Sequence, residues 1–288
     1  MSSAGLIVPV RVNALRLRAR ASILLVVVSL FGLVAFAWPL LIRHHEASPD
    51  LAHAGDAPWL LAILLPLLLA VVAAEISAGG IDAKALALLG ILGACGAALR
   101  PFAVGATGFS LIFFLLIPAG RVLGRSFGFV LGALTLFASA LLTAGVGPWL
   151  PFQMLGAAWV GFFAGCLPGR LRGRCEVLVL AGYGAIAGLA YGLLLNMWFW
   201  PLVASGTSTD FVAGAPLLTN LHRFLVYDIT TSLGFDVPRA VGNFVLVLLA
   251  GPAVLRALRR AARRAAFDAP VEFESHHAVD ETSPPVAA

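Results

Sequence analysis

The chain has 288 residues, of which 60% are hydrophobic and only 11% carry charge, and its mean hydropathy is +0.97. An ordinary soluble domain is about one quarter charged, because its surface must meet water. So few charges cannot cover the surface of a soluble protein of this length. The composition therefore excludes a soluble protein and indicates an integral membrane protein.

Long apolar segments follow one another along the chain. A spanning helix needs about 20 mostly apolar residues, and eight segments approach this length: Ser22–Ile42, Trp59–Ile76, Ala83–Leu99, Thr107–Val122, Phe127–Thr143, Pro151–Leu167, Val177–Trp198 and Pro238–Leu255. The fourth is short and contains Pro118, so a kinked helix or a re-entrant segment is an alternative there. The sequence predicts an all-α integral membrane protein with about eight transmembrane helices.

Lysine and arginine residues are unevenly distributed over the connecting segments. With an inner N-terminus, fifteen of the 19 lie inside: Arg11, Arg16, Arg18, Arg20, Lys84, Arg121, Arg125, Arg170, Arg172, Arg174, Arg256, Arg259, Arg260, Arg263 and Arg264. Because cytoplasmic loops are enriched in these residues, we expect both termini to be cytoplasmic. Anionic lipid at the inner face accounts for the net charge of +5, so no nucleic-acid partner is expected.

The predicted segments fall into five regions. Residues 1–21 form a basic cytoplasmic N-terminus, 22–80 hold two transmembrane helices, and 81–266 hold six more. Within the six-helix part, residues 201–237 are expected to form an outer loop, with an interfacial or partly inserted helix acting as a lid. Residues 267–288 are polar, acidic and proline-rich, so a disordered cytoplasmic tail is predicted.

Glycines recur at four-residue intervals in the six-helix part. The three runs are Gly120, Gly124, Gly128 and Gly132, then Gly161, Gly165 and Gly169, then Gly184, Gly188 and Gly192. This spacing places small residues on one helical face and lets helix backbones approach closely in lipid. We interpret the runs as helix-packing seams, and a surface that slides against another membrane subunit is the alternative.

Three stretches resemble a known family: DAKALALLGILGACGAALRP, GRVLGRSFGFVLGALTLFASALLTAGVGPWLPFQMLGAAWVGFFAGCLP and FLVYDITTSLGFDVPRAVGN. They are similar to the substrate-binding (S) components of energy-coupling factor transporters, in the actinobacterial form, over residues 81–266. The two N-terminal helices depart from the six-helix pattern of that family.

The resemblance implies a subunit of the bacterial plasma membrane that captures a vitamin or vitamin-like micronutrient outside. It would deliver the substrate inward together with a transmembrane coupling subunit and two cytoplasmic ATPases. ATP would be used by those partners, and this chain would bind no cofactor of its own. The family's AxxxA contact with the coupling subunit matches Ala83, Ala87, Ala94 and Ala98.

Substrate-binding candidates lie at the predicted outer helix ends and in the long loop, where family binding sites are found. Polar groups at the hydrocarbon edge are expensive and tend to be functional. The chosen residues are Trp149, Gln153, Asn196, Trp198, Trp200, His222, Arg223, Tyr227, Asp228 and Asn243. The same loop also holds Asp210, Asn220, Asp236 and Arg239.

Plainer roles compete with binding at several of these positions. Arg223 and Asp228 could instead pair with each other or contact water. Arg100 could extend to the lipid headgroups. The tryptophans could serve as interfacial anchors.

The nature of the ligand is only partly indicated. Aromatic and amide groups suit a flat or amphiphilic vitamin better than a bare cation. Metal-transporting relatives carry a histidine directly after the initiator methionine, where this chain has Ser2, so no metal site is predicted. The residues do not select one vitamin, and cobalamin is suggested only by the wider family.

Two other classes compete with this interpretation. An intramembrane enzyme would need a catalytic set inside the spans, and no GxSG with a helical histidine, no glutamate pair and no HExxH motif occurs. A self-sufficient secondary transporter would carry internal repeats and ionisable groups at mid-membrane, whereas Glu75 and Glu176 are expected at inner ends only. We therefore expect no enzymatic activity from this chain.

Overall fold

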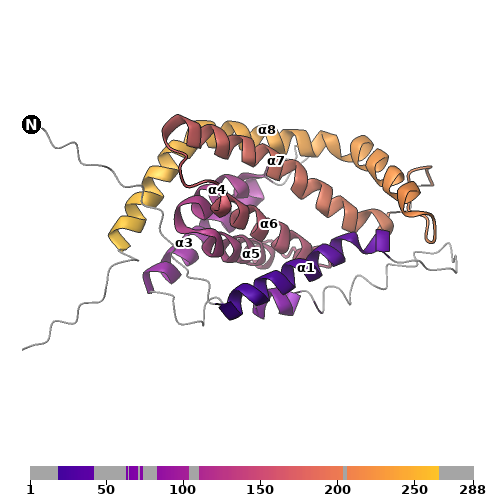
Figure 1. The fold of residues 1–288 in the computed structure, drawn as a ribbon, viewed down its shortest axis with the longest axis horizontal. Coiled ribbons are helices and arrows are strands. Elements are labelled where there is room, and N and C mark those ends of the chain that lie inside the picture. The colour runs from indigo at the N-terminus through magenta and orange to yellow at the C-terminus, as the bar shows by residue number, and fades with distance from the viewer. Residues whose placement is uncertain are drawn as a thin grey trace, which may run out of the picture.

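The computed structural model describes residues 19–41, 63, 65–70, 72–73, 83–103, 110–203 and 206–265, whose regular elements are all helices. They are α1 (Ala19–Leu41), α3 (Ala83–Ala103), α4 (Leu111–Leu123), α5 (Arg125–Leu142), α6 (Leu150–Cys166), α7 (Gly173–Phe199), the 3-10 helix η1 (Trp200–Leu202) and α8 (Leu217–Ala265) (Figure 1). Residues 63, 65–70, 72 and 73 of the second predicted span are helical as well. The basic segment 1–18 and the tail 266–288 lie outside the described residues.

Four described helices are long and apolar enough to cross a membrane: α3, α5, α7 with η1, and α8. Shorter apolar helices are Leu25–Leu41, α4 and α6. Large apolar side chains such as Ile186 and Leu249 are more than two thirds exposed, as expected where lipid rather than water is the neighbour. The prediction of an all-α integral membrane protein is confirmed.

Helix α4 lies at the centre of the bundle. Apart from Phe114, the residues from Ile112 to Leu123 are buried, and the helix contacts α3, α5, α6, α7 and α8. At 1.5 Å per residue its 13 residues cover about 20 Å, less than the bilayer core of about 30 Å. The weakest of the eight predicted spans is therefore a short, buried helix that contains Pro118.

Three glycines from three helices meet in the core. A methyl group at Gly120 or Gly128 would overlap the carbonyl oxygen of Gly161, and one at Gly161 would overlap the carbonyl oxygen of Gly128. The backbones of α4, α5 and α6 therefore touch without side chains between them. Gly124 has a φ of 100° and separates α4 from α5, so the first glycine run bridges two helices rather than lining one face.

Helix α1 belongs to the bundle and packs on α6 and α7. The Phe36 ring meets that of Phe152 edge-on at 5.0 Å, and the Trp159 indole nitrogen donates a hydrogen bond of 3.1 Å to the Ser29 hydroxyl. Trp159 thus has a structural role in the middle of its helix. The first additional helix is therefore attached to the same helix that carries Gln153.

Helix α8 includes residues 217–237 of the predicted lid region, where an interfacial helix was expected, and continues without a break into the predicted last span. The structure has one continuous helix of 49 residues from Leu217, about 74 Å long at 1.5 Å per residue, and it lies alongside α7 before its last part bends away (Figure 1). Pro238, predicted to open the last span, and Pro252 both lie inside it. Prolines are tolerated in membrane helices when neighbouring groups satisfy the freed backbone carbonyls, so Pro238 gives no reliable boundary.

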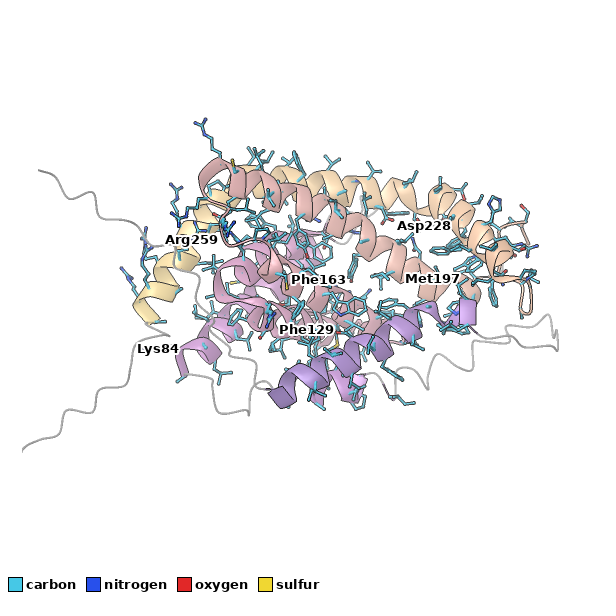
Figure 2. The ribbon with its side chains drawn as sticks, in the orientation of Figure 1. Lys84, Phe129, Phe163, Met197, Asp228 and Arg259 are labelled. Carbon is cyan, nitrogen blue, oxygen red and sulfur yellow. The ribbon has the colours of Figure 1, made fainter. Side chains whose placement is uncertain are left out.

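The bundle has two chemically different ends. Trp149, Trp198 and Trp200 mark one, which we call the tryptophan end, while Arg121, Arg174 and Arg259 mark the other, the arginine end. Figure 2 shows Arg259 and Lys84 at one end and Asp228 toward the opposite one. Assignment of the arginine end to the cytoplasm remains a prediction.

Candidate functional site

A row of polar side chains on α8 faces a row of glycines on α7. The glycines are Gly184, Gly188 and Gly192, followed on the same face by Asn196; the α8 residues are Asp228, Ser232, Asp236, Arg239 and Asn243. We call Asn196 and these five α8 residues the polar seam. Steps of three or four residues keep all of them on one side of α8, so the seam runs along the helices toward their middle.

Nearest the tryptophan end, Asn196 joins the two helices. Its amide nitrogen donates to Asp228 Oδ1 at 2.7 Å and to the Ser232 hydroxyl at 2.6 Å. Of the predicted binding residues, Asn196 and Asp228 are brought into direct contact. Ser232 was not predicted, although it lies four residues after Asp228 and four before Asp236, a spacing that indicates a shared helix face.

The middle of the seam holds an ion pair. Arg239 Nη1 lies 2.6 Å from Asp236 Oδ1 and donates a second, longer bond of 3.3 Å to the carbonyl of Gly188. A methyl group at Gly192 would overlap the Asp236 carboxylate, so the glycine provides the space for that side chain. The Arg239 guanidinium also lies 5.8 Å from the centre of the Tyr191 ring, a cation–π distance.

Asn243 is the deepest residue of the seam. Its side chain is 1% exposed and its amide nitrogen is 3.5 Å from the carbonyl oxygen of Gly184. Its amide oxygen has no hydrogen-bond partner among the described residues. The prediction that Asn243 lies near an outer helix end is wrong, because α8 begins 26 residues earlier, at Leu217, and Asn243 sits near its middle.

A second polar contact joins α3 to α6. Arg100 Nη2 donates to Gln153 Oε1 at 2.7 Å, so Arg100 turns toward a bundle helix instead of extending away from it. Its buried Nη1 has no partner among the described residues. A methyl group at Gly156 on α6 would overlap the Tyr191 ring. This tyrosine, which the sequence did not single out, lies between α6 and the Arg239 side chain of the polar seam.

The three predicted tryptophans have different surroundings. Trp198 is buried against Phe152, with ring centres 4.6 Å apart, and its indole nitrogen has no partner among the described residues. Trp200 is fully buried and donates to the Thr209 carbonyl at 2.8 Å. Trp149 is 43% exposed and donates to the Gly145 carbonyl within its own turn. Of these three tryptophans, Trp198 therefore has an unpaired indole nitrogen, and Trp149 has an exposed side chain.

The remaining loop candidates lie away from the seam. His222 is exposed, and Arg223 Nη1 is 3.4 Å from the Asp210 carbonyl oxygen. The backbone carbonyl of Tyr227 accepts the Thr231 hydroxyl. The alternative pairing of Arg223 with Asp228 does not occur, because residues five apart on a helix point about 140° from each other, and Asp228 faces α7.

A buried charge cluster closes the arginine end. Glu176, which is 2% exposed, accepts bonds of 2.7 Å from Arg121 and from Arg259. Arg121 Nη1 also donates to the carbonyls of Leu167 and Pro168 at 3.0 Å. These bonds tie α4, α7 and α8 to the turn after α6. Since the Glu176 carboxylate pairs with both arginines, we interpret the cluster as a structural contact that holds these helices together.

The alanines predicted to contact a coupling subunit share one exposed face. Ala83, Ala87, Ala94 and Ala98 are all exposed on α3, and no atom lies within 4 Å of where a methyl group at Gly90 would be. This face is uncovered by the described residues, and the exposed Ile91 also lies on it, between Ala87 and Ala94. Its role stays a prediction.

Comparison with protein-family models, with curated proteins and with solved structures found no match. The fold and the site together define the chain as an all-α integral membrane protein with a polar seam inside its bundle.

Proposed function

We propose that the chain is the substrate-specific membrane subunit of an energy-coupling-factor-type uptake transporter. In this function it captures a vitamin or vitamin-like micronutrient outside and delivers it inward, together with a coupling subunit and two ATPases. The protein resides in the bacterial plasma membrane with both termini in the cytoplasm, so the tryptophan end faces outward. Chemical energy comes from ATP hydrolysed by the partners.

One observation supports the proposal most strongly: polar groups with unsatisfied hydrogen-bonding capacity are buried between membrane helices. The described residues give no partner to Arg100 Nη1, Trp198 Nε1 or Asn243 Oδ1. Buried polar atoms are normally paired, and leaving one unpaired costs about 1–3 kcal/mol. Groups kept at this expense suit a ligand that completes their hydrogen bonds.

The chemistry of these groups fits a neutral or zwitterionic amphiphile. Asp236 and Arg239 neutralise each other, and the free atoms include both donors and an acceptor. Aromatic rings lie in the same bundle: Trp198 packs on Phe152, and the Tyr191 ring lies 5.8 Å from the Arg239 guanidinium. Ligand pockets are mostly apolar with a few polar groups that fix orientation, and a flat vitamin-like molecule matches that composition.

The exposed α3 alanines supply a surface for the partner. The small alanine side chains let a neighbouring helix approach closely beside the exposed Ile91, which favours association in lipid. Substitution of Ala87 or Ala94 by leucine would block that approach. We expect such variants to lose ATP-dependent uptake while retaining ligand binding.

Uptake of labelled vitamins into cells tests the function. Uptake should require the coupling subunit and the ATPases as well as this chain. Trp149→Ala should weaken ligand binding without changing the amount of folded protein, since Trp149 is 43% exposed and its indole nitrogen donates to Gly145 in its own turn. An equal loss of protein and of binding would instead support an anchoring role for Trp149.

A second candidate, a self-sufficient secondary transporter, is favoured by one observation. The Asp236–Arg239 pair lies inside the bundle, and ionisable groups inside membranes frequently serve ion or proton coupling. Purified protein in liposomes distinguishes the two. Transport driven by an ion gradient without partners would support the carrier and contradict the uptake subunit.

A further inference from the structure

A groove at the arginine end lies between the start of α7 and the last third of α8. Its volume is about 510 Å³, and the residues that carry the argument are Arg174, Leu178, Leu248, Pro252, Arg256 and Arg259. It is separate from the polar seam, which continues from Asn243 toward the tryptophan end. We propose that this groove binds one anionic phospholipid, with an acyl chain along its floor and the phosphate at its arginines.

The groove is charged at one end and apolar along the rest. Arg174 and Arg256 are exposed, and among the described residues neither has an ion-pair partner. Arg259 is one third exposed and shares Glu176 with Arg121. Three arginine side chains therefore line the groove beside one carboxylate that is already neutralised, which leaves a local excess of positive charge for a phosphate.

Apolar side chains continue from the arginines toward the middle of the bundle. Leu248 precedes Arg256 by eight residues, which is about 12 Å along a helix. Leu178 is 55% exposed on the opposite wall. Pro252 adds an apolar side chain to the α8 wall. An apolar groove next to guanidinium groups matches an acyl chain attached to an anionic headgroup, and basic pockets between membrane helices bind such lipids.

The surface beside the groove has the same character. Arg256, Arg260 and Arg264 alternate with Ala253, Ala257 and Ala261 around a neighbouring hollow. Arg256 lines both hollows, so the phosphate is expected at this residue. The bend of α8 lets its last, arginine-bearing part turn away from α7 (Figure 1). A lipid that fills the opening would hold the two helices together there.

Native mass spectrometry of the full chain in detergent tests the proposal. The probes are phosphatidylglycerol and phosphatidylcholine with identical acyl chains, and glycerophosphoglycerol as the headgroup without chains. We expect one phosphatidylglycerol per chain, bound at least tenfold more tightly than phosphatidylcholine, and no binding of the headgroup alone at the same concentrations. The variant R174Q with R256Q should lose about 30-fold in phosphatidylglycerol affinity, since each arginine near an anionic lipid contributes roughly a fivefold factor.

Matched variants separate the site from general charge and from folding. R170Q with R263Q removes the same charge from two exposed arginines outside the groove and should change the affinity less than twofold. Leu178→Trp should fill the groove and exclude the lipid, whereas Ile186→Trp on exposed α7 surface should not. The melting temperature in lipid-free detergent should stay the same in all four variants.

Four results would overturn the proposal. They are equal affinity for the two lipids, an equal loss in the two double variants, binding of the chain-free headgroup, and a dimer that dissociates only in R174Q with R256Q. The last result would assign the groove to a second copy of the chain. Because the assay involves neither a vitamin nor partner subunits, its outcome is independent of the proposed uptake function.

Discussion

The contact among α4, α5 and α6 and the contact between α7 and α8 use the same glycine spacing for opposite purposes. In the first, Gly120, Gly128 and Gly161 bring three backbones together with no side chain between them. In the second, Gly188 and Gly192 leave room for polar side chains of α8. Glycine spacing therefore identifies a helix contact in lipid, while the partner helix decides whether that contact is apolar or polar.

The difference has a consequence for function. A backbone-to-backbone contact has no space for a ligand and fixes the helices with van der Waals contacts. The polar seam, in contrast, holds charges and amides that a ligand can engage. We therefore expect substitutions in the first contact to reduce stability, and substitutions in the second to reduce binding more than stability.

The largest effect is expected for Gly161→Ala. The added methyl group meets the backbone of Gly128, which cannot move away as a side chain can, so α5 and α6 must separate. Overpacking of a core costs about 1–3 kcal/mol, and we expect about 3 kcal/mol here. The free energy of unfolding in detergent micelles measures it. An unchanged stability would mean that the three helices are not in backbone contact.

Breaking the ion pair of the seam should have an intermediate effect. Asp236→Asn removes the charge that Arg239 contacts at 2.6 Å, and hydrogen bonds to charged groups contribute about 1.5–3 kcal/mol. We expect a loss of about 2 kcal/mol in unfolding free energy. The double variant Asp236→Asn with Arg239→Gln should recover most of it, because no unpaired charge remains. Additive losses in this double-mutant cycle would show that the two residues do not interact.

The smallest effect is expected for Gly192→Ala. Its methyl group meets the Asp236 carboxylate, the far end of a side chain that can rotate, so about 1 kcal/mol or less is expected. Ligand binding should fall more than stability. Gly182→Ala is the matched control on the same helix, since no atom lies within 4 Å of its methyl group, and it should leave both unchanged or slightly raise stability. Equal effects at Gly192 and Gly182 would contradict the view that Gly192 provides space for the Asp236 side chain.

The sequence predicted the helices better than the site. Helices α5 and α7 begin two and four residues before the predicted Phe127 and Val177, because apolar runs fix their positions. The start of α8 was missed by 21 residues, since Pro238 was taken as the start of the last span and the polar stretch before it as a loop with a separate interfacial helix. Membrane helices can contain prolines and, when a neighbour covers them, polar residues.

The missed start of α8 also limited the prediction of the site. Asn196 and Asp228 were both chosen for their polarity, but their contact depends on α8 continuing through Asp228 to face α7. The alternative Arg223–Asp228 pairing was wrong because residues five apart on a helix point about 140° from each other. Tyr191 carries no signal in the sequence, because an aromatic residue in a membrane helix is usual and its position between α6 and Arg239 depends on tertiary packing.

The most direct test of the proposed function is native mass spectrometry of gently purified protein, made in cells grown on rich medium. The wild-type chain should carry a small molecule of vitamin-like mass. Occupancy should fall strongly in Asn196→Ala and in Asp236→Asn with Arg239→Gln, while Gly182→Ala retains it. Folded protein that carries no such molecule, or that carries it equally in all variants, would contradict the account of a ligand held at the polar seam.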